Sequence, residues 1–418
     1  MRKILQSRGL RFIFTANMVS MVGSGMNSAA VTWYILQATH TEVALGTMIV
    51  MQTIPSMLLL PFTGVLIDRE DRRRIVMLLD AGRGLIVLTV ALLAIYGRVH
   101  VWQLYLMYVL VSIGFWMFWP SITALIQELT PGAEYVQSNT MMMAGFQGGW
   151  VLAGALVGFV YNHIGLGGVL LIDFMTYVVS FSCYLMVRKG RHVVERPQTP
   201  ELAEIEGAVA KFVHELREGL HYLRGNRAVV LLGISWSLFL GAMISQGVVT
   251  APLSDRILHA GAVGYGWLNG GWGSGAFLSA FYVPALIGAM TERRALVLGF
   301  AVLASCMFLV PHVPWLALAV LVYVFMGSAR GIAGVAVSTG MMHLVPKHFM
   351  GRVQNTFYFA GLALQIFLAV LVGATAHRIG LAYAFALIAT AYTLAFFAAL
   401  MTKPAAARVE QLSEAAVE

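Results

Sequence analysis

Four ionisable side chains lie within long apolar stretches of the sequence, where an isolated charge is unfavourable. Asp80 and Arg83 are three residues apart, whereas Asp173 and Arg330 lie in separate stretches without another charged residue. A charge placed in hydrocarbon costs about 3 kcal/mol on insertion scales, so such groups usually pair with a partner or face a polar cavity. These residues are the first candidates for binding or moving a charged species.

Each of the four also has a structural interpretation. Asp80 and Arg83 are about one helical turn apart and can pair on one face, which favours a structural ion pair. Asp173 could be a proton-coupling acid, but a structural role beside a neighbouring polar group is favoured. Arg330 lies among glycines, where it could attract an anionic group, pair with an acid, or extend toward the headgroups.

The composition places these residues in a membrane protein. Of the 418 residues, 59% are hydrophobic and only 11% are charged, whereas soluble proteins carry roughly 25% charged residues. A soluble surface cannot be built from so few ionic groups. The apolar stretches are continuous, unlike the ~10-residue alternating segments of a membrane β-barrel. We therefore expect an all-α membrane protein.

Twelve stretches are long enough to cross a hydrocarbon core, which takes about 20 residues of helix. They are predicted at 11–37, 43–67, 74–97, 101–126, 138–162, 165–187, 228–252, 262–289, 295–311, 314–340, 353–377 and 380–402.

Lysine and arginine are distributed unevenly among the connecting loops. With the N-terminus placed inside, 22 of the 27 basic residues fall in cytoplasmic segments and only three in the opposite loops. Basic residues are enriched on the cytoplasmic side of membrane proteins. Both termini are therefore expected in the cytoplasm of a multi-pass inner (cell) membrane protein, and the net charge of +8 needs no nucleic acid partner.

The longest polar segment, 188–227, is expected to be a cytoplasmic linker. Apolar residues between Leu202 and Leu223 recur in it at helical spacing. This pattern predicts an amphipathic helix on the membrane surface or on the helical bundle, with a simple tether as the alternative.

An internal repeat relates the two halves of the chain. Residues 129–187 resemble 344–402, as in the matching triplets Ile164-Gly165-Leu166 and Ile379-Gly380-Leu381. Repeats with the same topology enclose a cavity near the membrane midplane. The sequence therefore predicts two six-helix bundles with a cavity between them. The full predicted division is bundle 1–187, linker 188–227, bundle 228–402 and tail 403–418.

Twelve spans, a long central loop and the repeat resemble the major facilitator superfamily. Its motif between the second and third helices is Gly-x-x-x-Asp-Arg/Lys-x-Gly-Arg/Lys-Arg/Lys. The chain matches the motif, with Asp71 at the usual glycine, in the segment Gly64-Val65-Leu66-Ile67-Asp68-Arg69-Glu70-Asp71-Arg72-Arg73. Within the superfamily, the chain is similar to the branch of the enterobactin exporter and the macrolide efflux proteins. This similarity is carried by the same loop, by Asp80 and Arg83, and by the junctions at 130–139 and 346–353.

The resemblance implies a gating role for this loop. Asp68 would dock on a helix N-terminus, where free N–H groups carry partial positive charge, and hold the cytoplasmic side closed. Arg69 and Arg72 would be its basic partners, and Gly64 and Arg73 belong to the same loop. The alternative is a loop whose charges only fix orientation.

The resemblance also implies a central cavity lined by helices one, two, four, five, seven, eight, ten and eleven. Binding cavities are mostly apolar with a few oriented polar groups, which suits a bulky amphipathic substrate. Packing or an interfacial belt is the alternative for each tryptophan. The polar and aromatic candidates on these helices are Asn27, Gln52, Trp116, Trp119, Gln147, Trp150, Gln246, Asn269, Trp272, Tyr358 and Gln365.

The predicted function is secondary-active export of a small amphipathic compound, such as a drug, macrolide or siderophore-like molecule, by a monomer. A proton is the expected coupling ion, although Gly154–Gly158 lacks the proline of the family's antiporter element. An importer, a lipid transporter and a non-transporting receptor homologue are the alternatives. The sequence has neither a phosphate-binding loop nor metal-ligand spacing, so no cofactor, metal or enzymatic activity is expected.

Overall fold

The computed structural model describes residues 7–59, 71–130, 135–187, 202–346 and 349–402, and these residues form twelve α-helices. A short π-helix and a short 3-10 helix continue two of them. Ten of the helices are long and apolar enough to cross a membrane. Residues 43–67 were expected to form one span, of which 60–67 lie outside the described residues.

The first group of helices comes from the N-terminal part of the chain. It consists of α1 (Arg8–Thr39), α2 (Glu42–Leu59), α4 (Arg72–Ile95), α5 (Val101–Leu129) and α6 (Tyr135–Leu185). Helix α1 is 32 residues long but is not among the ten apolar candidates. It buries polar side chains, including Asn17, Ser20 and Asn27, against its neighbours.

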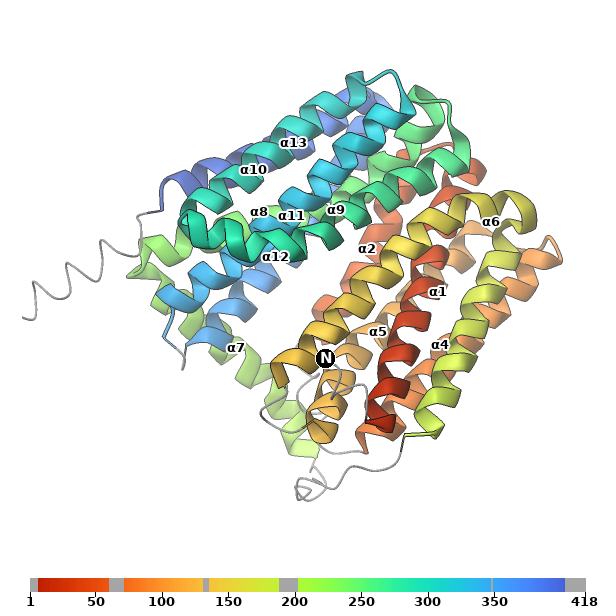
Figure 1. The fold of residues 1–418 in the computed structure, drawn as a ribbon, viewed down its shortest axis with the longest axis horizontal. Helices are drawn as coiled ribbons and strands as arrows, with labels where there is room; N and C mark the ends of the chain where they lie inside the picture. The colour runs from red at the N-terminus through yellow and green to blue at the C-terminus, as the bar shows by residue number, and fades with distance from the viewer. Residues whose placement is uncertain (1–6, 60–70, 131–134, 188–201, 347–348, 403–418) are drawn as a thin grey trace, which may run out of the picture.

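Helix α6 contains two segments that the sequence predicts as separate spans, 138–162 and 165–187. They join directly at Gly165, which has a left-handed φ of 65° and breaks the helical geometry. Glycine adopts this conformation without the steric penalty of a Cβ atom. The yellow ribbon turns back on itself there (Figure 1), so the 51 residues of α6 form a hairpin of helices.

The second group comes from the C-terminal part of the chain. Its helices are α7 (Leu202–Arg224), α8 (Arg227–Pro252), η3 (Leu253–Ile257), α9 (Gly261–Ala289), α10 (Glu292–Leu309), η4 (Val310–His312), α11 (Leu316–Leu344), α12 (Met350–Arg378) and α13 (Leu381–Leu400).

The two groups lie side by side, with α1–α6 in red to yellow and α8–α13 in green to blue (Figure 1). The main contacts between them join α6 to α9 and α2 to α12. A buried apolar core runs through both groups, and a smaller cluster lies between α1, α4, α5 and α6.

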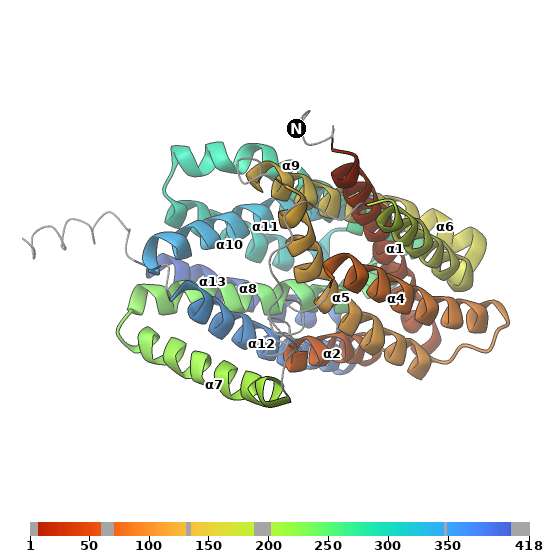
Figure 2. The same cartoon turned by 90° about the horizontal axis from the view of Figure 1, so that it is seen from below.

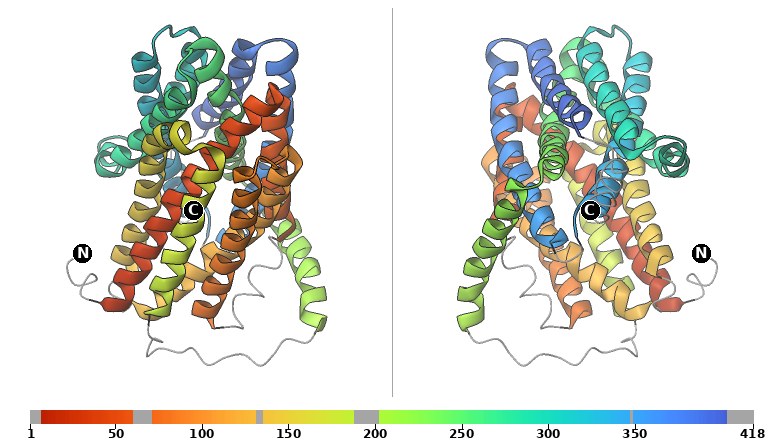
Figure 3. Two further views of the ribbon diagram at one scale, coloured as in Figure 1. Left: turned by 90° about the vertical axis from the view of Figure 1, so that its right-hand side faces the viewer. Right: turned by 90° about the vertical axis from the view of Figure 1, so that its left-hand side faces the viewer.

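Helix α7 packs on the second group and lies alongside α12 (Figure 2). Gly219 brings it close to α12, Glu218 pairs with Arg352 at 3.1 Å, and Tyr222 stacks on Phe349 with ring centroids 4.7 Å apart. Helix α7 marks one end of the molecule, the end at which α1 begins (Figure 3). Within the described residues, the linker therefore includes a docked helix.

Candidate functional site

A cavity of about 560 Å³ lies between the two groups of helices. Its wall is formed by α1, α2, α5 and α6 on one side and α8, α9, α11 and α12 on the other. These elements correspond to the eight helices that the sequence analysis expected around a cavity. Arg83 of α4 and Tyr177 in the second half of α6 also reach the wall.

Ten of the eleven cavity candidates line this wall. They are Asn27, Gln52, Trp116, Gln147, Trp150, Gln246, Asn269, Trp272, Tyr358 and Gln365.

Trp119 was expected on the wall, but it is not among the residues that line it. It lies on α5, and its ring packs edge-on against Phe146 of α6 with centroids 5.2 Å apart. Phe146 lines the cavity instead. The two halves of the protein meet across the cavity at Trp116 and Tyr358, whose rings are 5.7 Å apart.

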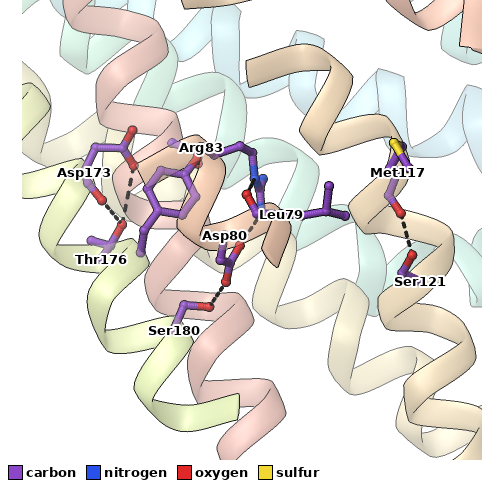
Figure 4. Close-up of polar contacts among 10 residues, drawn as sticks. Leu79, Asp80, Arg83, Met117, Ser121, Asp173, Thr176 and Ser180 are labelled. Carbon is purple, nitrogen blue, oxygen red and sulfur yellow. Dashed lines mark hydrogen bonds and ion pairs between the residues drawn. The ribbon is translucent and has the colours of Figure 1, made fainter. Parts of the chain in front are cut away.

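Asp80 and Arg83 form a buried ion pair on α4, as their spacing predicts (Figure 4). Asp80 is fully buried and also accepts a hydrogen bond from Ser180 of α6 at 2.6 Å. The Arg83 guanidinium lies over the rings of Phe118 and Tyr177, at 4.5 and 5.0 Å from their centroids. Its charge is thus balanced locally, although the side chain reaches the cavity.

Asp173 lies behind the cavity wall and is fully buried. Its carboxylate accepts a hydrogen bond of 2.6 Å from the Asn27 amide. The Thr176 hydroxyl lies 3.4 Å from the carboxylate on the next turn (Figure 4). Asn27 itself lines the cavity. The carboxylate is therefore hydrogen-bonded to a side chain of the cavity wall.

Arg330 reaches the cavity from α11. Its guanidinium carbon lies 4.8 Å from the centre of the Trp272 ring, and its Nε lies 3.2 Å from the Met243 sulfur. Among the described residues, no carboxylate forms an ion pair with it. A cation held against an aromatic face in this way keeps most of its N–H donors free.

The charged loop is only partly described, because Gly64, Asp68 and Arg69 lie outside the described residues. Arg72 pairs with Glu128 of α5 at 2.9 Å. Arg73 donates hydrogen bonds of 2.7 and 2.8 Å to the carbonyl groups of Tyr184 and Leu185 at the end of α6. A cation is favourable at a helix C-terminus. Both arginines therefore join helices of the first group.

Asp71 takes the place of the glycine in the loop motif and is the N-cap of α4. Its carboxylate accepts hydrogen bonds from the backbone N–H groups of Arg73 and Arg74, at 3.1 and 3.4 Å. Aspartate is among the preferred residues at this position. The departure from the motif thus gives the third predicted span a defined beginning.

At the end of the molecule opposite α7, an ion pair that was not expected from the sequence joins the two groups of helices. Glu42 of α2 is fully buried and its carboxylate lies 2.5 Å from the guanidinium of Arg256. His377 of α12 lies 3.8 Å from the other carboxylate oxygen. The sequence places an acid and a base at helix ends on the same expected side of the membrane. It does not show that these two residues pair.

Glycines bring the two groups into close contact near this end. A Cβ atom at Gly154 or Gly158 of α6 would lie 2.6 Å from backbone atoms of α9. A Cβ atom at Gly46 of α2 would lie 2.6 Å from the carbonyl oxygen of Ala369 on α12. Small residues of this kind allow helix backbones to approach closely in membranes.

Comparison with known families gives one match over most of the chain. The model of the Major Facilitator Superfamily matches residues 13–364.

Several characterised and uncharacterised bacterial proteins are similar in sequence. Macrolide efflux protein A of Streptococcus pyogenes is 23% identical over 54% of this chain and 54% of its own length. The uncharacterized MFS-type transporters YkuC and YfiS of Bacillus subtilis are 24% and 22% identical, over 60% and 90% of this chain and 57% and 89% of their own lengths. The chain thus spans just over half the length of the first of these relatives.

Two solved structures share the fold. The nucleoside transporter NupG has a TM-score of 0.75 at 12% identity, covering 94% of this chain and 99% of that one. A bacterial homologue of the human lysosomal transporter Spinster, in an inward-facing and unoccupied conformation, has a TM-score of 0.65 at 16% identity and covers 94% of this chain and 95% of that one.

Proposed function

The chain belongs to the Major Facilitator Superfamily, and from this premise we propose that it exports a small amphipathic compound by alternating access. The cavity of about 560 Å³ between two groups of helices is the observation that carries the proposal. Cavities of this volume suit drug-sized ligands. The similarity to macrolide efflux protein A supports the direction of transport.

The proposed transporter has twelve membrane spans in two parallel six-helix repeats. Ten apolar candidates, the hairpin at Gly165 that makes two spans of α6, and α1 together supply twelve crossings. In this division, 1–187 and 228–402 are the two bundles, 188–227 is the linker and 403–418 is the tail.

We place both termini and α7 on the cytoplasmic side of the cell membrane, and treat the transporter as a monomer. The asymmetry of basic residues supports this orientation. The ion pair between Glu42 and Arg256 then lies on the outer side, where it would hold the cavity closed to the exterior. Asp68 and its neighbouring arginines would close the opposite side when the bundles rock.

The proposed driving force is a proton gradient. Asp173 is the acid that we consider for coupling, because its carboxylate is hydrogen-bonded to Asn27, which lines the cavity. A buried acid of this kind in a membrane protein is a candidate proton site by default.

Flux measurements in proteoliposomes would test the proposal. A panel of amphipathic anions, cations and neutral compounds is loaded, and flux is followed with and without a pH gradient. We expect flux of at least one class that is accelerated by the gradient, with the acceleration lost in Asp173→Asn. Gradient-driven uptake in the inward direction would support an importer, and no flux of any class would support a receptor.

A further inference from the structure

We propose that the cavity selects compounds carrying an anionic group, with Arg330 as the counter-ion and the surrounding tryptophans as the site for the apolar body. This inference rests on the proposed function, because it names the substrate class of the same cavity.

Arg330 has N–H donors for which the described residues provide no strong acceptor. A guanidinium carries five N–H donors in a planar fork that fits a carboxylate or phosphate in a bidentate manner. The contacts of this side chain within the described residues are the Trp272 ring and, through Nε, the Met243 sulfur, which is a weak acceptor. Two amino groups of the guanidinium therefore remain for a ligand.

The opposite wall of the cavity shows the same excess of donors. The indole N–H of Trp150 and one terminal nitrogen of Arg83 are buried without a hydrogen-bond partner. Both groups can donate but cannot accept. The Asn27 carbonyl is a buried acceptor on this wall without a partner. A ligand rich in acceptor oxygens would satisfy more of these groups than a ligand rich in donors, and buried polar groups need partners.

The acids near the cavity do not neutralise Arg330. Among the described residues, no aspartate or glutamate lines the wall. Asp80 is bound to Arg83 and Ser180, and Asp173 is bound to Asn27 behind the opposite wall. A cationic ligand in the cavity would face the Arg330 charge without a carboxylate to contact, which opposes its binding in a site of low dielectric constant.

Aromatic rings define where the apolar part of the ligand would lie. Trp116, Trp150, Trp272 and Tyr358 line the cavity together, and Trp272 lies directly under the Arg330 guanidinium. A ligand with a carboxylate beside a ring system can contact the arginine and the tryptophans at once. The substrate class is therefore an aromatic or otherwise apolar organic anion.

Three naphthalene probes of matched shape test the charge preference: naphthylacetate, naphthylacetamide and naphthylmethylammonium. Binding to the purified full-length protein in detergent is measured by isothermal titration calorimetry. We expect naphthylacetate to bind about tenfold or more tightly than the ammonium probe, which corresponds to one charge-assisted hydrogen-bonding contact. In Arg330→Gln this preference should disappear, while the neutral amide still binds.

Two further variants separate charge from folding. Arg330→Lys keeps the charge without the fork and should retain part of the preference for naphthylacetate. Arg294→Gln removes an exposed arginine at the start of α10 and should leave all three affinities unchanged. Binding of the amide to Arg330→Gln shows that the cavity is intact.

Equal binding of the ammonium and carboxylate probes would overturn the inference, and so would an unchanged preference in Arg330→Gln. The binding result and the flux result can fail separately. Arginine-dependent anion binding without flux would support the inference and contradict the transport proposal. Flux of cations or neutral compounds, without a charge preference in binding, would support transport and contradict the inference.

Discussion

Asp80 and Arg83 place two opposite charges in one site between α4 and α6, with almost no contact with solvent. Removing one member of a buried pair leaves the other charge without a partner, whereas replacing both with apolar groups is often neutral. We therefore expect the loss of one partner to destabilise the protein by more than the attraction between the two charges stabilises it.

This leads to a prediction for Asp80→Asn. The variant should be destabilised by about 3–5 kcal/mol, because Arg83 keeps its buried charge without a counter-ion. The double variant Asp80→Asn with Arg83→Met should recover much of the loss. Ser180→Ala, which removes one hydrogen bond to Asp80, should cost about 1 kcal/mol. Thermal unfolding in detergent measures all three, and a double variant less stable than Asp80→Asn would contradict the argument.

The pair of Glu42 and Arg256 differs because one partner is partly exposed. The Arg256 side chain is 43% exposed while that of Glu42 is fully buried. Arg256→Ala should therefore destabilise the protein by about 1–3 kcal/mol, less than a fully buried pair, and the loss should shrink at high salt. Unfolding at low and high salt checks this. Arg378→Ala, at an exposed arginine on the same side, is the control and should have no effect.

Sequence reasoning at this scale succeeds where contacts are local. The spacing of Asp80 and Arg83 predicts their pair because one helix fixes both positions. The orientation of the Arg330 side chain depends on its contacts with Trp272 and Met243, which belong to other helices. Trp119 has the right type and helix for the cavity, but Phe146 of α6 occupies that part of the wall. Neither outcome can be read from spacing.

Among the elements, α6 and α9 form the most extensive contact between the two groups. A Cβ atom at Gly158 would lie 2.6 Å from the Ala262 oxygen and from the Val263 Cα. Backbone atoms cannot move aside as a flexible side chain can. The close packing of α6 against α9 therefore depends on the absence of a side chain at this position.

We predict that Gly158→Val separates the two helices. Overpacking of this kind costs about 1–3 kcal/mol, and flux should fall several-fold because this close packing no longer forms. Gly148→Val is the matched control, since a Cβ atom at Gly148 of the same helix meets nothing within 4 Å. Flux per reconstituted protein decides the matter, and equal flux in both variants would contradict the prediction.

The elements themselves are largely readable from the sequence. Most predicted spans match described helices, because an apolar run of about 20 residues has few structures open to it in a membrane. The hairpin at Gly165 lies where the sequence separates two predicted spans, and one glycine takes the place of a loop there. Helix α1 contains several polar residues, which it buries, so it is not among the ten apolar candidates although its length suits a span.

The two groups of helices are joined in the whole molecule by contacts of α6 with α9 and of α2 with α12. Alternating access requires these contacts to separate while the contacts within each group persist. Val151 of α6 and Gly273 of α9 provide a way to test this, because a Cβ atom at Gly273 would lie 3.3 Å from the Val151 Cα. The two positions are adjacent across the contact of α6 with α9, so cysteines placed there can be tested for crosslinking by oxidation.

A disulfide between Val151→Cys and Gly273→Cys should stop transport. The background replaces Cys183 and Cys306, the two native cysteines, with serine. Oxidation should abolish flux, and a reducing agent should restore it, because the bond joins the two groups. Each single-cysteine variant should stay active under oxidation. Full flux in the oxidised, crosslinked protein would mean that the groups do not separate.

Arg330 has an electrical consequence for the transport cycle. Moving one elementary charge through a membrane potential of 100 mV changes the free energy by about 2.3 kcal/mol. The cavity of the empty carrier contains the Arg330 charge without a counter-ion among the described residues. When a monoanion is bound, its negative charge balances that of Arg330. Voltage should then govern the return of the empty carrier and leave the loaded step nearly insensitive.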